Sequence, residues 1–122
     1  MCKESIVDDR QGKLAGHHAR NRQLLMVFAE KSVSLDELRL VEFHFWAFEQ
    51  HNAVELGHEL RKRGFELLAL KPVSSQHDPE CWNIEASMVA SISSVISQEF
   101  TEALLDLAAR FGAEYDGWGT SV

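Results

Sequence analysis

The stretch that decides the fold is residues 95–120, VISQEFTEALLDLAARFGAEYDGWGT. Its first part predicts an amphipathic helix from about Val95 to Phe111, because apolar residues recur there at helical spacing. These residues are Ile96, Phe100, Ala103, Leu104, Leu107 and Ala108. Gly112 follows as the expected C-terminal cap. Residues 113–120 then return to a short aromatic strand pattern, whose two internal glycines indicate a bulge or a close backbone approach.

Two further strands are expected upstream of this helix. Residues 40–47 alternate, with Val41, Phe43 and Phe45 pointing to one side and polar neighbours to the other. Residues 82–90 alternate in the same way, with Ile84, Ala86 and Met88 on one side. Each pattern is typical of a strand that is buried on one face only.

Between these strands we expect a helix from Glu49 to Arg63, which ends at Gly64 in the left-handed conformation. Phe65 to Lys71 then predicts another strand, which Pro72 should stop. Residues 72–80 collect Ser, Gln, His, Asp and Pro, a composition typical of an exposed loop.

The element order predicts an α+β fold. A leading amphipathic helix, expected at about residues 12–31, precedes a β-α-β-β-α-β core at about residues 38–120 of one domain, residues 1–122. Two β-α-β units that shield the same sheet face give a ferredoxin-like α/β sandwich. We therefore expect a four-stranded antiparallel sheet with the first and third strands central, two helices on one face and an extra N-terminal helix.

The charge balance makes nucleic acid a poor candidate ligand. The 122 residues contain 19 acidic and 12 basic side chains, so the net charge of −7 repels phosphate backbones and attracts cationic partners. The basic run Arg61, Lys62 and Arg63 falls at a predicted helix end, where cations meet the helix dipole favourably.

The location expected from the sequence is cytoplasmic. Cys2 and Cys81 lack the spacing of a metal knuckle or an oxidised scaffold, which favours a reducing compartment. Residues 1–11 are polar and carry no signal-peptide core, and no run of about 18 apolar residues suggests a membrane span.

The strand alternation predicts an acidic and aromatic surface on the sheet face away from the helices. Its expected members are Glu42, His44, Trp46, Glu66, Asn83, Glu85, Glu114, Asp116 and Trp118. Such a surface could dock a cationic protein segment, with a tryptophan as anchor. It could equally be solvated, or covered by the leading helix. RNA-binding modules of this topology stack bases on sheet aromatics, but carboxylates on the same face would repel phosphates.

No pattern in the sequence calls for an enzyme or a cofactor. There is no nucleophile elbow, phosphate loop or dinucleotide fingerprint. His51, Glu55 and His58 share a helix, but a metal site there would need ligands from other helices, so no metal is expected. Cys81 is better explained as small core filler than as a nucleophile.

The segment from Leu107 to Thr120, and Glu-Tyr-Asp-Gly-Trp-Gly-Thr in particular, resembles the closing helix and strand of the RraB family, regulators of ribonuclease E activity B. Looser similarity extends upstream through Val41 to Phe45, Arg63 to Glu66 and the strand around Ile84. The resemblance implies a ferredoxin-like domain that binds the arginine-rich, non-catalytic region of ribonuclease E and dampens RNA turnover. Within the motif, Tyr115 should point into the core, while Asp116 and Trp118 face outward.

The sequence thus supports a non-catalytic regulator that binds a protein with a basic segment. The resemblance suggests ribonuclease E as this partner. Direct binding to nucleic acid or to a membrane is not expected. The alternative is a ligand-binding or dimeric assembly domain, because ferredoxin-like sheets often pair face to face in homodimers.

Overall fold

Eight helices and strands build the described part of the chain, which in this computed structural model comprises residues 10–73 and 81–121. In chain order they are α1 (Arg10–Glu30), β1 (Arg39–Ala47), α2 (Gln50–Lys62), β2 (Glu66–Val73), β3 (Cys81–Ala90), α3 (Ile92–Val95), α4 (Gln98–Arg110) and β4 (Ala113–Thr120). The order after α1 confirms the expected β-α-β-β-α-β core, with the short helix α3 added before α4.

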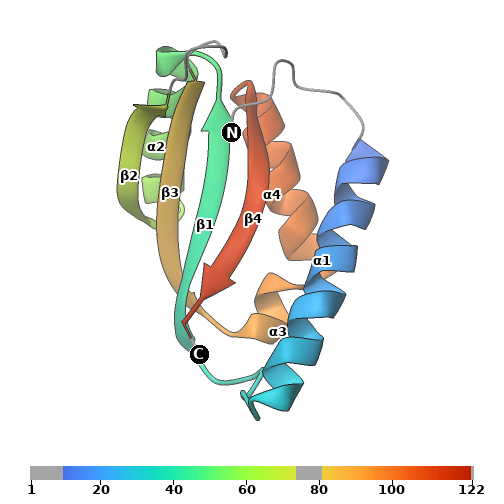
Figure 1. The fold of residues 1–122 in the computed structure, drawn as a ribbon. Coiled ribbons are helices and arrows are strands. Elements are labelled where there is room, and N and C mark those ends of the chain that lie inside the picture. The colour runs from blue at the N-terminus through green and yellow to red at the C-terminus, as the bar shows by residue number, and fades with distance from the viewer. Residues whose placement is uncertain (1–9, 74–80, 122) are drawn as a thin grey trace.

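The strands form one antiparallel sheet in the order β2-β3-β1-β4 (Figure 1). The first and third strands are therefore central, as expected for a ferredoxin-like sandwich. Helices α2 and α4 lie on the same side of this sheet (Figure 1). We call the opposite side the helix-free face.

Alternation along β1 creates the core. Val41, Phe43 and Phe45 are fully buried toward the helices, while the residues between them point to the other side of the sheet. The aromatic rings interlock, since Phe43 packs edge-on against Phe65 and also contacts Phe100 of α4. Helices α2 and α4 bury their apolar stripes against this layer.

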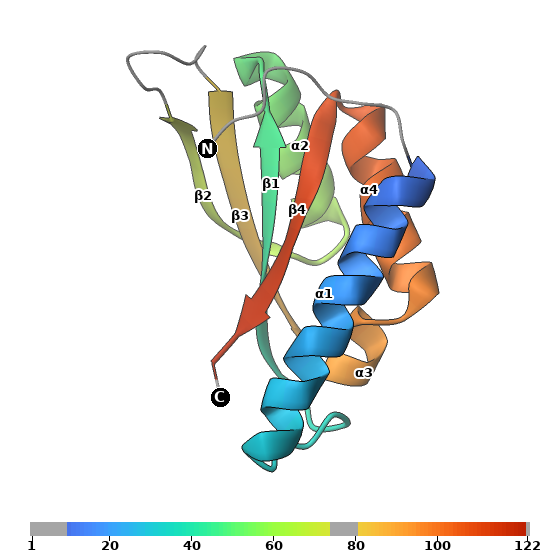
Figure 2. The ribbon, with the colours of Figure 1, turned by 45° about the vertical axis from the view of Figure 1, so that its right-hand side comes forward.

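Helix α1 extends the helical layer rather than covering the helix-free face. It lies beside α4 and along the edge strand β4, on the helical side of the sheet (Figures 1 and 2). Asn21 and Phe28 of α1 are buried there. None of the helices in residues 10–73 and 81–121 crosses the helix-free face (Figure 2), which answers a question that the sequence leaves open.

Two element boundaries differ from the prediction. Strand β2 continues through Pro72 to Val73, because β2 is an edge strand and a proline there need not donate to a neighbour. The predicted loop therefore begins later, and residues 74–80 lie outside the described part of the chain. The predicted helix from Val95 is divided at Ser97, whose side chain caps α4 by accepting a hydrogen bond from the Phe100 amide.

Candidate functional site

The helix-free face is centred on three neighbouring cross-strand pairs of the two central strands. Glu42 lies opposite Ser87, His44 opposite Glu85, and Trp46 opposite Asn83. Because side chains alternate along each strand, all six point away from the buried core residues of β1. The sequence prediction placed Glu42, His44, Trp46, Asn83 and Glu85 together on this face, and the register confirms that placement.

Glu42, His44 and Glu85 form a polar triangle in the middle of this face. His44 Nδ1 lies 3.8 Å from Glu85 Oε1, and the Asn83 side-chain amide donates a 3.0 Å hydrogen bond to the other oxygen, Glu85 Oε2. Glu42 reaches the same spot from two residues earlier on β1, so that ligand atoms of Glu42, His44 and Glu85 all lie within 4.8 Å of one another. The His44 and Glu85 side chains are 37% and 25% exposed, so a ligand from solvent can reach them.

Carboxylates of the two edge strands flank the triangle. Glu66 of β2 is exposed and lies opposite Ser87, and Glu114 of β4 is largely buried and lies opposite Trp46. Lys71 of β2 adds a cation opposite Asn83. Glutamates from all four strands therefore share the helix-free face, with one lysine toward the β2 edge.

Asp116 and Trp118 of β4 do not both follow the predicted alternation. The pairing of β4 with β1 shifts by one residue between His44 and Phe45, so Asp116 is an extra residue in the ladder. Asp116 is exposed, and its charge acts on His17 of α1, which places it where β4 meets α1. It therefore belongs to the rim of the helix-free face rather than to its centre.

The prediction that Trp118 faces outward is wrong. After the bulge, Trp118 pairs with Phe43 and shares its inward direction, so only 2% of Trp118 is exposed. Its indole Nε1–H donates a 2.9 Å hydrogen bond to Asn21 Oδ1 of α1, and its ring lies 6.1 Å from that of Phe28. Trp118 is thus a structural anchor for α1 and is not available as a partner contact.

The remaining motif residues complete this attachment of α1. Tyr115 is buried, as predicted, and stacks on His17 with ring centroids 4.7 Å apart. Arg20 of α1 donates a 2.8 Å hydrogen bond to the Trp118 carbonyl. Gly117 has φ +137°, a conformation that glycine adopts without strain, and a Cβ there would meet the Arg20 guanidinium. The Tyr-Asp-Gly-Trp run therefore joins β4 to α1.

Two exposed apolar residues on the helix-free face were missed by the sequence prediction. Leu40 and Val89 lie opposite each other on β1 and β3 and are 57% and 60% exposed. The signal was present, because Leu40 is two residues from Glu42 and Val89 is four residues from Glu85, so strict alternation puts them on the same face. They provide an apolar margin to the acidic surface.

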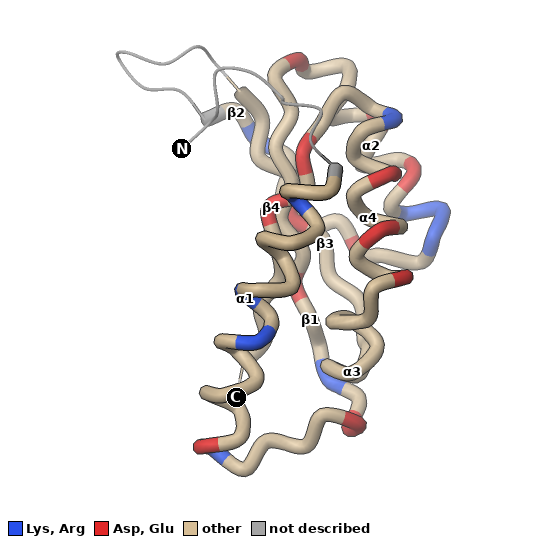
Figure 3. Tube along the Cα trace, turned by 90° about the vertical axis from the view of Figure 1, so that its right-hand side faces the viewer, with Lys and Arg blue, Asp and Glu red and all other residues tan. Residues whose placement is uncertain are grey.

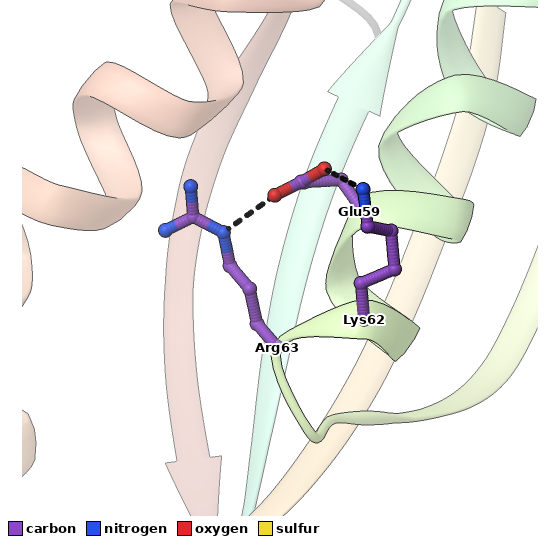
Figure 4. A network of polar contacts seen from close by, with 3 residues as sticks. All are labelled: Glu59, Lys62 and Arg63. Carbon is purple, nitrogen blue, oxygen red and sulfur yellow. Dashed lines mark hydrogen bonds and ion pairs between the residues drawn. The ribbon is translucent and has the colours of Figure 1, made fainter.

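The basic run at the end of α2 is partly neutralised, in keeping with the helix-end interpretation. Arg63 Nε donates a 2.9 Å hydrogen bond to Glu59, and Lys62 Nζ lies 3.7 Å from the same carboxylate (Figure 4). The Arg63 hydrogen bond lowers the pKa of Glu59. These contacts give the two cations a partner within their own helix.

The histidines of α2 do not assemble into a metal centre. His51, Glu55 and His58 are all exposed on α2. Among residues 10–73 and 81–121, three possible ligand side chains do lie close enough together to hold one ion. They are Glu42, His44 and Glu85 of the helix-free face.

Two observations bear on the expected location. Cys81 is fully buried, as expected of core filler, but it is disulfide-bonded, which the interpretation of the two cysteines as typical of a reducing compartment does not predict. Cys2, the other cysteine of the chain, lies outside the described residues. None of the helices in the described ranges combines the length and the apolar character needed to cross a bilayer.

Comparison with known proteins adds independent information about the chain. The family model RraB, described as regulator of ribonuclease activity B, matches residues 18–120. A protein of Photobacterium profundum named regulator of ribonuclease activity B is 30% identical over 106 residues, which cover 81% of this chain and 76% of that relative. The matched residues include all four strands and, in the attachment of α1 to β4, Arg20, Asn21 and Phe28, whereas His17 lies just before them.

Proposed function

The chain belongs to the family of regulators of ribonuclease activity B, and from this premise we propose that it regulates a ribonuclease by binding it, without catalysis of its own. The proposed partner is ribonuclease E, contacted through an arginine-rich segment outside its catalytic part. The observation that carries the proposal is the helix-free face, where glutamates from four strands share one surface with the half-buried Trp46.

Electrostatic attraction is the first step of the proposed mechanism. Glu42, Glu66 and Glu85 lie on the helix-free face and bring negative charge to the site of contact. Such a surface raises the encounter rate with a basic segment and orients it, and the effect weakens as salt screens the charges. Binding should therefore be salt-dependent.

Arginine in particular suits this surface. Its planar guanidinium can form paired hydrogen bonds with a carboxylate and can stack on an indole ring, which lysine does less well. Trp46 lies beside His44 along β1 on the helix-free face, close to Glu85. The exposed Leu40 and Val89 offer apolar contact for any hydrophobic residue between the arginines.

The basic residues of the chain are concentrated elsewhere. Figure 3 shows Lys and Arg along α1, which lies at the β4 edge of the sheet. Acidic residues also lie on α4 (Figure 3), so acidity alone does not define the binding face. The proposal depends on carboxylates, an indole and apolar residues occurring together on one face of the sheet.

The test measures the affinity for a synthetic arginine-rich peptide from the non-catalytic part of ribonuclease E, at low and at high salt. We compare the double variant Glu42→Gln/Glu85→Gln with a matched control, Glu55→Gln/Glu99→Gln, which removes the same charge from exposed positions of α2 and α4. At about 0.5–1 kcal/mol per charge, the first variant should bind about 5- to 30-fold more weakly. The control should change binding less than about twofold.

Equal losses in the two variants would mean that only net charge matters, and the proposed face would be wrong. Unchanged binding in the Glu42→Gln/Glu85→Gln variant would refute the electrostatic mechanism itself.

A sheet-to-sheet homodimer is the alternative function, and the exposed pair Leu40 and Val89 is the observation in its favour. Two copies joined through this face would bring carboxylates together, which costs free energy unless cations intervene. Light scattering over a range of concentrations distinguishes the two, because our proposal predicts a monomer with an accessible Trp46.

The proposal also places the protein in the cytoplasm, where thiols are kept reduced. Protein alkylated in denaturant at the moment of cell lysis, so that the buried Cys81 is accessible, should then carry label on both cysteines. Resistance of Cys81 to alkylation until a reductant is added would mean that its disulfide exists in the cell, and would argue for an oxidising compartment.

A further inference from the structure

We propose that Glu42, His44 and Glu85 form a binding site for a zinc-class divalent cation on the helix-free face. This would be a metal site built across two central strands. The effect of the metal on partner binding rests on the function proposed above, whereas metal binding itself does not.

The backbone holds the three side chains in place. His44 and Glu85 are directly opposite each other in the β1–β3 ladder, and Glu42 is two residues from His44 on the same side of β1. Their ligand atoms lie within 4.8 Å of one another, and the His44–Glu85 pair is at 3.8 Å. Zinc at about 2.0–2.2 Å from each ligand needs ligand separations near roughly 3.3 Å. The proposal requires side-chain rotations that bring the three ligand atoms closer together while the strands keep their register.

The donor set favours zinc over magnesium. One imidazole and two carboxylates use ligand types that zinc accepts, and three protein ligands leave a position for water or a further ligand. Magnesium prefers oxygen ligands in a strict octahedron and holds its water tightly, so an exposed imidazole offers it little. The site should therefore take zinc, or a neighbouring transition metal, before magnesium.

A neighbouring side chain supports one of the ligands. The Asn83 amide donates to Glu85 Oε2, which leaves Oε1 on the side of His44. A fixed outer hydrogen bond of this kind orients a metal-binding carboxylate and reduces the freedom lost on binding. Both carboxylates also gain from a cation, because they lie close together on an acidic face.

Metal binding would oppose the proposed recognition of a basic segment. A divalent cation would neutralise the charges of Glu42 and Glu85 and would occupy His44, three residues in the middle of the acidic face. Zinc should thus weaken binding of the arginine-rich peptide.

The test uses the full chain and zinc alone, by calorimetry or by competition with a chromogenic chelator. We expect saturable binding of one zinc ion, weakened by about tenfold or more in His44→Gln, by analogy with losses on changes around metal sites. His58→Gln is the matched control, because His58 is an exposed histidine of α2 outside the site, and it should bind zinc as the unaltered chain does. Circular dichroism confirms that the variants are folded.

Nuclear magnetic resonance of the unaltered chain gives a second readout that needs no variant. Zinc should shift the imidazole signals of His44 and the amide signals around Glu85. Equal zinc affinities of the His44→Gln and His58→Gln variants, or zinc-induced shifts away from β1 and β3, would overturn the proposal.

Peptide binding is then measured with zinc and with a chelator. Zinc should weaken it in the unaltered chain but not in His44→Gln. Absence of zinc binding with retained peptide binding in chelator would refute this inference alone, whereas zinc binding without peptide binding would refute the proposed function alone.

Discussion

Replacement of Asn21 by leucine should loosen α1 from the rest of the molecule. Asn21 is 5% exposed, and its Oδ1 accepts the 2.9 Å hydrogen bond from the indole of Trp118, which is 2% exposed. Leucine keeps the branched shape of asparagine, is somewhat larger and has no acceptor, so the buried indole N–H loses its partner. An unsatisfied buried donor costs about 1–3 kcal/mol.

The assay is unfolding in denaturant, followed by circular dichroism, with the thermal midpoint as a second measure. The free energy of unfolding should fall by about 1–3 kcal/mol, and the midpoint by roughly 3–5 °C for each kcal/mol in a chain of this size. Trp118→Phe alone should also destabilise the protein, because it leaves Asn21 buried without its donor and removes ring volume.

The double variant Asn21→Leu/Trp118→Phe separates the hydrogen bond from these other effects. With both partners replaced by apolar groups, its cost should be smaller than the sum of the single costs by about 1 kcal/mol. Single costs that add within about 0.3–0.5 kcal/mol would mean that the two residues are not coupled. The described attachment of α1 to β4 would then be incorrect.

Three further predictions concern the contact between α1 and β4 and the helix-free face. Burial lowers the pKa of His17 below its ordinary value of 6.5, so the imidazole of the unfolded chain binds a proton at a higher pH than that of the folded chain. The free energy of unfolding, measured from pH 7.5 downward, should therefore fall more steeply in the unaltered chain than in His17→Gln. Equal slopes would mean that His17 is exposed in solution. Gly117→Ala should lower the free energy of unfolding by about 1–3 kcal/mol, because Gly117 has a positive φ and a Cβ there would meet the Arg20 guanidinium. Gly119→Ala is the control, because its Cβ would have open space around it, and it should lower the free energy of unfolding by less than about 0.5 kcal/mol. Trp46→Leu should weaken peptide binding by about 1 kcal/mol or more, while folded Trp118→Phe should bind normally; the reverse result would restore Trp118 as the anchor.

Most of the fold could be predicted because alternation and helical spacing are local signals. The alternation of β1 identified its buried and exposed faces, and the pairing with β3 then followed from the topology. Gly64 and Gly112 both have positive φ, as expected for residues that end helices. Such features depend on a few adjacent residues, which a sequence displays directly.

The direction of Trp118 could not be predicted by counting residues along β4. A single extra residue in a strand reverses the direction of every side chain after it. The glycines of the motif indicated a bulge, but its position is fixed by where β4 pairs with β1, at His44 and Phe45. The buried indole of Trp118 donates its hydrogen bond to Asn21, which is 97 residues away in the sequence.

The position of α1 was equally hidden from the sequence. Its buried contacts involve a polar residue, Asn21, and a half-buried histidine, His17, so hydrophobic spacing alone does not define the face that packs. Only when α1 is seen beside β4 does it become clear that the acidic face remains uncovered by the described helices (Figure 2). The candidate site therefore depends on tertiary packing as much as on strand alternation.

The central claim is that a basic partner segment docks on the outer side of β1 and β3. Chemical-shift mapping of the ¹⁵N-labelled protein, titrated with the arginine-rich peptide in the presence of a chelator, tests this claim most directly. The account predicts the largest shifts around Glu42, Trp46 and Glu85 and little change along α1 and α4. Shifts concentrated on the helices, with an unaffected sheet, would contradict it.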